Sequence, residues 1–267
     1  MQEIKSTPDS IRTYLKKIWV HRYMILVLAK RDLKIKYAQT IIGVTWTLVY
    51  PATAVIIYTV FFSSVLNIKA QYPYSLFVLS GVVCWGIFSY IFNQAGPSLL
   101  NNSDIVKKMQ FPKIIIPLSK CILALVEFVI SFAFFIALLF VFEIPFSWLW
   151  LLFPLAIIPV FLFATGSALL LSGGTIKKRD LFHIIPFIVN FSIWFTPVFY
   201  PVNIIPDKYQ YVLNVNPISS SINLFRHIFF NDPLNLFSFV GLMLALIVFI
   251  LGIGYFKFIE EKINDTI

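Results

Sequence analysis

Residues that could do chemistry are few in this sequence, and their spacing forms no recognisable reaction centre. The three histidines, His21, His183 and His227, lie far apart, and Cys84 and Cys121 each lie within an apolar run. The chain contains no Gly-x-x-x-x-Gly-Lys-Ser/Thr, His-Glu-x-x-His, Gly-x-Ser-x-Gly or Cys-x-x-Cys motif. We therefore expect a conduit rather than an enzyme, with no cofactor and no metal on this chain.

One acidic residue, Glu127, lies inside a long apolar stretch. An ionisable side chain is costly there and usually faces a bundle interior or water. Two interpretations stay open. Glu127 could serve a transport pathway or a conformational switch, or it could be a structural carboxyl group that is protonated or hydrogen-bonded to a neighbouring helix.

A short basic segment between two apolar runs is the second chemically distinctive feature. It covers residues 101–117 and carries Lys107, Lys108 and Lys113. Such a connection on the cytoplasmic side would let a protein outside the membrane act on helices inside it. Because the chain has no phosphate-binding loop of its own, we expect an external motor to act at this segment.

The composition requires most of the surface to face something other than water. The chain of 267 residues is 59% hydrophobic and 12% charged, with a mean hydropathy of +0.86. Soluble domains carry about 25% charged residues. We therefore predict an all-α integral membrane protein. The formal net charge of +9 does not indicate nucleic-acid binding, because the basic residues cluster beside apolar segments.

Six apolar segments are long enough to predict membrane spans. They are residues 40–66, 74–95, 121–142, 146–172, 182–200 and 236–256. All but three of the 21 Lys and Arg residues then lie on one side, the exceptions being Lys69, Lys208 and Arg226. The positive-inside rule therefore predicts that both termini are cytoplasmic. A stripe of small residues, Ala164, Ala168 and Ser172, allows close helix contact in the fourth span.

The segment before the first span is basic and amphipathic. Residues 10–29 place Ile11, Tyr14, Leu15 and Ile18 on one helical face and basic residues on the other. We expect this helix to lie on the inner membrane surface, with packing against a partner protein as the alternative. The predicted organisation is a cytoplasmic interface segment, 1–36, followed by a six-span domain, 37–267. No cleavable signal peptide is evident.

Residues 201–233 are too polar for a span and too apolar for an ordinary loop. Apolar residues recur there at helical spacing, with a break at Asn216 and Pro217. We predict re-entrant or interfacial half-helices on the outer side, between the fifth and sixth spans. Such backbone is tolerated at membrane depth only where protein or water covers it.

Aromatic residues within the spans and half-helices suggest a pathway for sugars, because ring faces offer flat contact without a fixed grip. The candidates are Trp46, Tyr58, Trp85, Phe88, Trp194, Phe199 and Tyr200. Lipid contact or core packing is the alternative for most individual rings.

Several stretches, in this order, resemble one family. They are residues 31–37 with Gly43-Val44-Thr45-Trp46 and Pro51, residues 106–113 with Pro117-Leu118, Arg179-Asp180-Leu181 with Pro186, and Thr196-Pro197-Val198-Phe199-Tyr200-Pro201, with weaker matches at Asn216-Pro217 and Phe225-Arg226. Together they resemble the membrane permease of ABC-2 type polysaccharide exporters, the O-antigen and teichoic-acid transporters. Thr196 stands where Ser is more common, and a Lys pair replaces a mixed pattern near Lys177.

The resemblance implies a homodimer of six-span subunits in the bacterial cytoplasmic (inner) membrane, paired with two copies of a separate ATPase that binds ATP and Mg²⁺. The substrate it implies is a polysaccharide linked to an undecaprenyl-diphosphate type lipid. ATPase coupling would involve Asp104, Lys107, Lys108, Gln110, Phe111 and Pro112. The substrate entrance would involve Lys177, Lys178, Arg179, Asp180 and His183. The outer gate would involve Asn216, Pro217, Phe225 and Arg226.

Two other functions remain open at this point. The same architecture could export small drugs or lipids. An intramembrane enzyme could use Glu127 together with His183 or Asp180. The sequence leaves the sugar repeat open, and with it the choice between O-antigen and teichoic acid.

Overall fold

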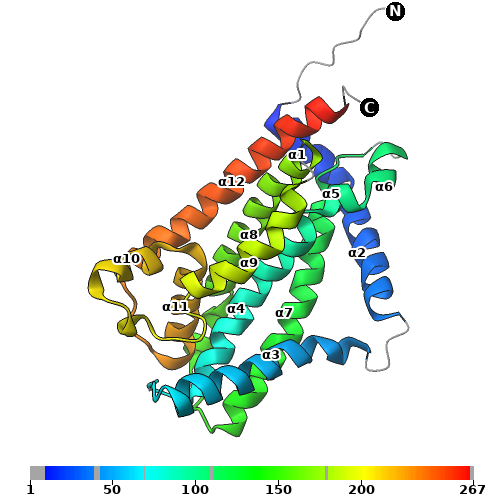
Figure 1. Ribbon diagram of the computed structural model, residues 1–267. Helices are drawn as coiled ribbons and strands as arrows, with labels where there is room; N and C mark the ends of the chain where they lie inside the picture. The colour runs from blue at the N-terminus through cyan, green and yellow to red at the C-terminus, as the bar shows by residue number, and fades with distance from the viewer. Residues whose placement is uncertain (1–9, 39–42, 69, 109–110, 178–179, 265–267) are drawn as a thin grey trace, which may run out of the picture.

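The computed structural model describes residues 10–38, 43–68, 70–108, 111–177 and 180–264. These residues form helices and connecting segments, with no strand among them. The first described helix, α1 (Ile11–Val20), and the end of α12 (Leu236–Asn264) lie at one end of an elongated bundle, which we call the terminal end (Figure 1). Helices α10 (Asp207–Val215) and α11 (Pro217–Phe230) lie at the other end, which we call the distal end (Figure 1).

Five helical segments are long and apolar enough to cross a membrane. They are Trp46–Val65, Tyr74–Ala95, Ile115–Val141, Trp148–Thr175 and Leu236–Glu260. The first joins α3 (Trp46–Tyr58) to a π-helical turn, η2 (Thr59–Val65), and the second is α4 (Tyr74–Ala95). The third is α7 (Ile115–Val141). The fourth joins the 3-10 turn η3 (Trp148–Leu152) to α8 (Phe153–Lys177), and the fifth belongs to α12 (Leu236–Asn264). These five agree with five of the six predicted spans.

The predicted fifth span, 182–200, is much shorter as a helix. Helix α9 covers Leu181–Ser192, and the 3-10 turn η4 adds Ile193–Phe195 before the chain leaves helical geometry at Thr196. At 1.5 Å per residue, α9 reaches about 18 Å, which is less than the ~30 Å hydrocarbon core. Pro197 explains the end of the helix, because the residue before a proline is biased away from helical geometry.

The N-terminal segment is two helices rather than the single helix predicted for residues 10–29. Helix α1 spans Ile11–Val20 and α2 spans Arg22–Tyr37, with a break at His21. Ser10 caps α1 by accepting from Thr13 N at 3.2 Å. The His21 ring meets the Lys17 carbonyl at 2.8 Å and ends α1. Hydrophobic periodicity does not reveal a local break of this kind, and so the single-helix prediction was wrong.

Four further helices and a 3-10 turn complete the terminal and distal ends. Helices α5 (Ser98–Asn101) and α6 (Ser103–Lys108) connect α4 to α7, which begins six residues before the predicted start at residue 121. At the distal end, α10 (Asp207–Val215) and α11 (Pro217–Phe230) confirm the predicted break. Asn216 caps α11 by accepting from Ile218 N at 2.9 Å. A short 3-10 turn, η5, covers Val202–Ile204.

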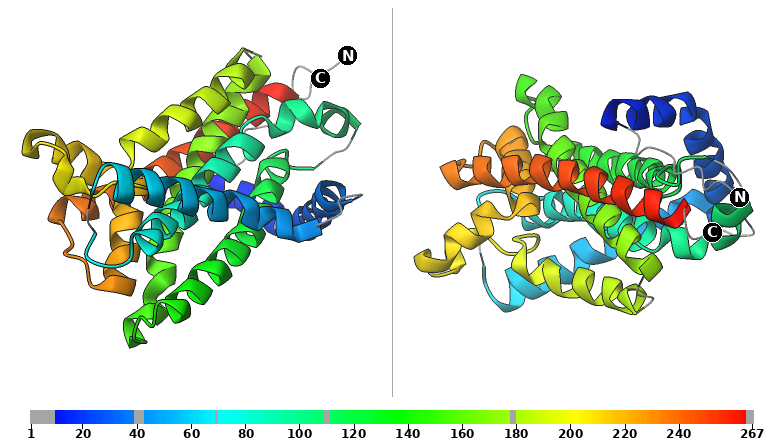
Figure 2. Two further views of the ribbon diagram at one scale, coloured as in Figure 1. Left: turned by 60° about the horizontal axis from the view of Figure 1, so that its bottom comes forward. Right: turned by 90° about the horizontal axis from the view of Figure 1, so that it is seen from above.

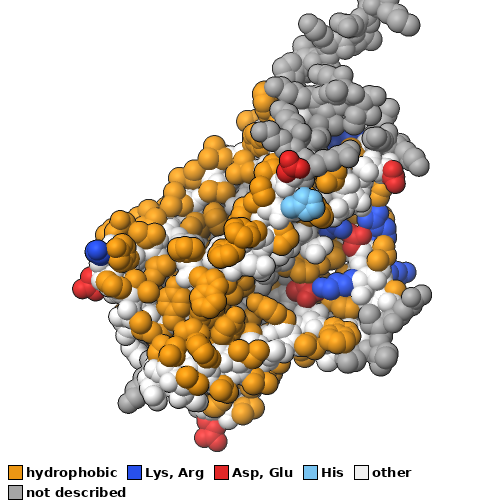
Figure 3. All heavy atoms as spheres, viewed as in Figure 1, with side chains coloured by type: hydrophobic (Ala, Val, Ile, Leu, Met, Phe, Trp, Pro, Cys, Tyr) orange, Lys and Arg blue, Asp and Glu red, His pale blue; other side chains and the backbone are white. Residues whose placement is uncertain are grey.

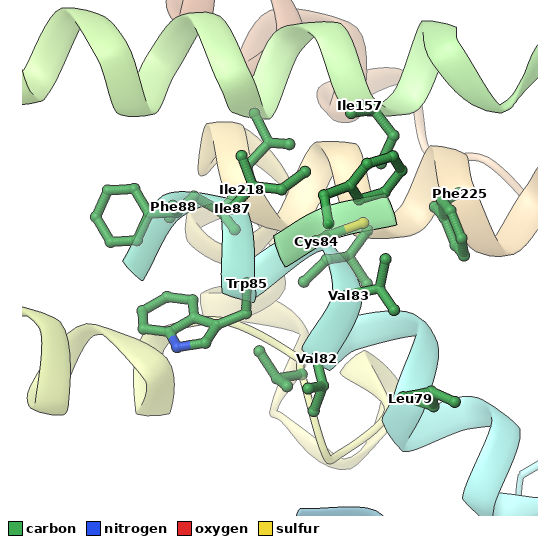
Figure 4. Close-up of a cluster of buried hydrophobic side chains, with 14 of the residues drawn as sticks. Leu79, Val82, Val83, Cys84, Trp85, Ile87, Phe88, Ile157, Ile218 and Phe225 are labelled. Atoms are coloured by element: carbon green, nitrogen blue, oxygen red, sulfur yellow. The ribbon is translucent and has the colours of Figure 1, made fainter. Parts of the chain in front are cut away.

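Helix α4 is the centre of the bundle. In its span 78% of the residues are buried, whereas the other four spans bury between 22% and 39%. Its side chains pack against α8 and α11 in one continuous apolar cluster (Figure 4). The outer helices expose large hydrophobic side chains over most of the visible face, while charged side chains gather near α2 and α6 (Figure 3). This distribution suits a bundle whose flanks meet lipid.

Helices α8 and α12 lie side by side along the bundle (Figure 2). Their closest approach is at two glycines, because a Cβ built on Gly252 would lie 2.4 Å from the Gly166 carbonyl oxygen. The predicted small-residue stripe of Ala164, Ala168 and Ser172 lies in α8 and is fully buried. Small residues therefore set the distance between these helices, as is common in membrane bundles.

We predict that Gly252→Ala lowers stability, because its methyl group would collide with the backbone of α8. The expected cost is about 1–3 kcal/mol, the range for overpacking a tight contact. Gly254→Ala is the matched control, since a Cβ there meets no atom within 4 Å. Thermal unfolding of both purified variants in lipid nanodiscs measures the difference. Equal melting temperatures for the two variants would contradict the helix contact described here.

Candidate functional site

The predicted coupling segment forms a short helix whose apolar side packs inward. In α6, Asp104 is exposed, while Val106 is buried. Phe111, three residues beyond α6, is also buried, in a cluster that includes Leu99 and Ile114. Pro112 is half-buried. Phe111 therefore anchors this segment to the bundle, and Asp104 lies on the exposed side of α6.

Some of the predicted site residues lie outside the described part of the chain. These are the side chains of Lys107, Lys108 and Lys177, and the whole of Gln110, Lys178 and Arg179. At the predicted entrance, the described residues are Asp180 and His183, which are exposed in the first turn of α9. The backbone N–H of His183 donates to the Asp180 carbonyl at 3.1 Å.

Lys113 stabilises α6 from within the protein. Its side chain is 7% exposed, and Nζ donates to the Val106 carbonyl at 2.8 Å. A lysine near the C-terminal end of a helix satisfies an unpaired carbonyl and opposes the negative end of the helix dipole. Lys113 belongs to the structure that holds α6.

Glu260, near the end of α12, joins three parts of the terminal end. It is 5% exposed, and Tyr14 OH of α1 donates to its Oε2 at 2.5 Å. Its Oε1 accepts a short hydrogen bond from the backbone N–H of Lys113, just before α7. A buried carboxylate needs such donors, because an unpaired charge away from water is strongly unfavourable. Glu260 therefore links α1, α12 and the segment that follows α6.

A second set of polar contacts joins α2 to the bundle. Asp32 accepts from Lys120 Nζ of α7 at 2.6 Å and from Arg31 Nη2 at 2.8 Å. The same Arg31 nitrogen donates to Asn102 Oδ1 at 3.0 Å, at the junction of α5 and α6. Asp32 and Lys120 are only 10% and 14% exposed, so solvent screens their attraction less than that of a surface pair. Helix α2 therefore contacts both α7 and the start of α6.

The structure supplies the partners of Glu127. Lys36 forms an ion pair with Oε1, and Tyr37 OH donates to the same oxygen at 2.8 Å. Burial raises the pKa of Tyr37 to about 12, so its hydroxyl keeps the proton that it donates. Both partners come from the end of α2. Asp180 and His183, which the enzyme hypothesis required, make no contact with Glu127 in the described residues.

Beside Glu127 lies the first cavity, with a volume of about 360 Å³. It lies between the end of α2 and helices α3, α4 and α7. Its polar and aromatic lining includes Lys36, Trp46, Tyr50, Tyr90, Asn93 and Glu127. The Lys36 ammonium lies 4.8 Å from the centre of the Tyr90 ring. Rings combined with amide and charged groups can contact both faces and edges of a polar ligand.

The predicted pathway aromatics fall into separate groups: Tyr58, Trp194, Phe199 and Tyr200 contact one another, and Trp85 contacts Phe88. Trp46 lines the first cavity, and Trp194 is exposed. Trp85, Phe88 and Phe199 are between 0% and 4% exposed in the protomer core, which corresponds to the core-packing alternative. Tyr58 stacks on Phe199 with 4.4 Å between ring centres. The Tyr200 hydroxyl donates to the Trp194 carbonyl at 2.7 Å.

At the predicted outer gate, Arg226 is a buried residue that holds neighbouring segments together. It is 3% exposed and donates to Ser80 Oγ, the Phe77 carbonyl and the Val198 carbonyl at 3.0–3.1 Å. Its guanidinium also lies 3.6 Å from the centre of the Phe77 ring. Phe225, on the same helix, is fully buried. Arg226 therefore ties α11 to α4 and to the chain after α9, although the sequence had placed it among charges on the outer side, in a predicted half-helix.

The sequence reasoning missed several residues that organise this site. Tyr14 was noted only as part of an apolar stripe, and Asp32, Lys120 and Glu260 received no role. One signal was available, because Asp32 and Glu260 are acids within or beside strongly apolar segments of a basic chain. Their partners are distant in sequence, and only the fold identifies them. Among the described residues, no group of His, Cys, Asp or Glu could hold a metal ion.

The Tyr14–Glu260 contact predicts a measurable coupling energy. Removing the hydroxyl with Tyr14→Phe should lower the free energy of unfolding by about 1.5–3 kcal/mol, as for hydrogen bonds to charged groups. The double variant with Glu260→Gln should lose less than the sum of the two single variants. Thermal unfolding in nanodiscs provides these values.

Tyr255→Phe is the matched control for this cycle, since it removes a hydroxyl from α12 for which the structure records no hydrogen bond. It should leave the melting temperature unchanged. Strict additivity between Tyr14→Phe and Glu260→Gln would show that the two side chains do not interact.

Comparison with known proteins assigns the chain to a family. Residues 23–230 match the family model for ABC-2 type transporters. An O-antigen export system permease protein RfbA of Klebsiella pneumoniae is 27% identical over 248 residues, covering 91% of this chain and 95% of that protein. The protein of the same name from Myxococcus xanthus is 26% identical over 224 residues, covering 82% and 85%. Because the family match includes most of the chain and the bundle offers five apolar spans, the protein belongs to the ABC-2 type transporters as a membrane-spanning transport subunit.

Proposed function

We propose that this chain is the permease of an ATP-driven exporter that moves a lipid-linked polysaccharide, such as O-antigen, across the bacterial cytoplasmic membrane. The observation that carries the proposal is the similarity to O-antigen export permeases over nearly the full length of both chains. The lipid is of the undecaprenyl-diphosphate type. Two copies of the permease work with two copies of a separate ATPase subunit, which binds ATP and Mg²⁺.

In this proposal the terminal end faces the cytoplasm and the ATPase docks on α6. Lys113 fixes α6 to the chain leading into α7, and Glu260 joins the same segment to α12 and α1. Arg31 adds a contact between α2 and the start of α6. A displacement of α6 would therefore move α1, α2, α7 and α12 together. Connected polar and packing contacts of this kind are the physical means by which such coupling is carried.

The orientation follows from the charges. Basic residues are concentrated in α1, α2 and the segments near α6, as positive-inside orientation requires of cytoplasmic segments. Arg226 does not oppose this orientation, because its charge is buried in protein rather than placed in an outer loop. Both termini are then cytoplasmic. Helix α9, which is too short to cross alone, and the half-helices α10 and α11 complete the sixth crossing and the outer gate.

The substrate class is supported by the first cavity. Its lining joins the rings of Trp46, Tyr50 and Tyr90 to amide groups, a combination that suits sugars better than a purely apolar drug or lipid. Near the start of α9, Lys177, Lys178 and Arg179 would meet the diphosphate of the lipid carrier. Basic side chains at an inner interface suit anionic head groups.

The decisive experiment reverses the charge of the coupling segment. We predict that Lys107→Glu with Lys108→Glu removes stimulation of the partner ATPase and lowers polysaccharide export at least several-fold, while the permease stays folded. Lys113 is kept, because its buried side chain supports α6. ATPase activity is measured with the co-purified complex in nanodiscs, and export by surface polysaccharide labelling.

Lys208→Glu is the control, a charge reversal on the exposed surface of α10 at the distal end. It should leave ATPase stimulation unchanged. Normal stimulation in the Lys107→Glu, Lys108→Glu variant would refute the docking role of α6. If the native permease copurifies with no P-loop ATPase, the exporter assignment itself fails.

A further inference from the structure

The protein has a second cavity, which lies at the distal end and is not part of the proposed inner pathway. Its volume is about 310 Å³, at the lower end of the range for small-molecule sites. Helices α10 and α11 form one side of it. The other side consists of residues 70–72, residues 201–203 and the connection 232–235 into α12. Two helices and three connecting segments therefore build this cavity together.

Side-chain amides dominate its lining. They belong to Gln71, Asn203, Gln210, Asn214, Asn223 and Asn235. Each amide offers an acceptor oxygen and two N–H donors. Asn223 donates to Asn214 at 3.2 Å, and Gln210 donates to the Ile205 carbonyl at 2.8 Å, which fixes the orientation of these groups. Gln71 and Asn203 make no side-chain hydrogen bond to described residues, so both remain available to a ligand.

The charges of the cavity argue against an ionic ligand. Among its lining residues only Arg226 and Asp232 carry formal charges, and these are opposite. The Arg226 guanidinium already donates to three protein oxygens, so it is poorly placed to hold an anion. A divalent cation prefers several carboxylates, whereas this cavity offers one carboxylate beside a buried arginine. The composition therefore favours a neutral ligand with many hydrogen-bonding groups.

Asp232 shows what such a ligand must supply. Its Oδ2 accepts from Tyr72 OH at 3.0 Å, while Oδ1 is buried and has no hydrogen-bond partner. A buried carboxylate oxygen without a donor is unfavourable. A ligand hydroxyl would satisfy it. The Tyr72 ring, held by stacking on Phe230 at 3.7 Å, adds a rigid apolar surface at the edge of the same cavity.

We propose that the distal cavity binds a sugar unit, through the amides of Gln71, Asn203 and Asn223 and the carboxylate of Asp232. A sugar combines hydroxyl donors and acceptors around its rim with apolar C–H faces, which matches the amides, the free carboxylate oxygen and the tyrosine ring. The inference rests on the proposed function in one respect, since it takes the sugar from the polysaccharide that is being exported. The cavity then holds a unit of the chain as it leaves the membrane, beside helix α11.

The first test measures sugar binding by the intact permease–ATPase complex in nanodiscs. Saturation-transfer difference NMR with glucose, galactose, mannose, rhamnose and N-acetylglucosamine, each added separately, should give a signal for at least one sugar. Gln71→Leu with Asn203→Leu keeps similar side-chain volume, removes the available amides and should reduce that signal at least fivefold. Both positions are exposed at the cavity rim, so the fold should persist. Lys208→Ala, on α10 but outside the cavity lining, should keep the full signal.

The second test identifies the source of the sugar. A photo-crosslinking amino acid, p-benzoylphenylalanine, replaces Val202, which lines the cavity. Irradiated cells that synthesise the polysaccharide should yield a high-mass conjugate that reacts with antibody to the polysaccharide. Cells unable to synthesise it should not. Adding Gln71→Leu and Asn203→Leu should reduce the conjugate at least fivefold.

The proposal is overturned if the Gln71→Leu, Asn203→Leu variant gives the same NMR signal and the same amount of conjugate as the unsubstituted protein. It is also overturned if neither test gives a signal. A sugar signal without a conjugate overturns the assignment to the exported chain and leaves free sugar as the ligand. These failures are distinguishable from failure of the proposed function. If only the sugar-site proposal fails, the cavity binds no sugar and export continues at the normal rate. If the proposed function fails, the permease exports no polysaccharide, and the NMR test of sugar binding can still be made.

Discussion

Each charge near the membrane core of this protein must find its partner within the chain, because lipid offers none. Glu127 takes its partners Lys36 and Tyr37 from α2, Glu260 accepts from Tyr14 of α1, and Asp32 of α2 accepts from Lys120 of α7. These contacts hold α1 and α2 against α7 and α12. The arrangement of the terminal end therefore depends on polar pairing, while the rest of the bundle depends on apolar packing around α4.

The same pairing holds α6 in place. A helix of six residues is too short to be stable alone in water. Here Lys113 bonds its carbonyl end, Val106 and Phe111 anchor its apolar side, and Asn102 before it meets Arg31 of α2. An ATPase that binds the exposed side of α6 would therefore act on a helix that is held in place and connected to four longer helices.

Helix α4 connects the two ends of the molecule. Its second half, from Val82 to Gln94, lines the first cavity beside Glu127, and Phe77 near its beginning lines the distal cavity. Arg226 holds α11 to the beginning of α4 through Ser80 and Phe77. The close backbone contact between Gly81 and Val198 adds the chain after α9 to the same point. Both cavities are thus lined by the most buried helix, where close packing holds the side chains in fixed positions.

The sequence by itself determined the class of protein, five of its spans, the break before Pro217 and the family, because hydropathy, proline geometry and ordered motifs act locally along the chain. It could not determine the break at His21 or the partners of Glu127, Arg226 and Glu260. The contacts of these three side chains join residues separated by up to 246 positions, as for Tyr14 and Glu260. Only the tertiary structure decided them, because a buried charge is satisfied by whichever donor the fold brings near, and sequence distance carries no information about that donor.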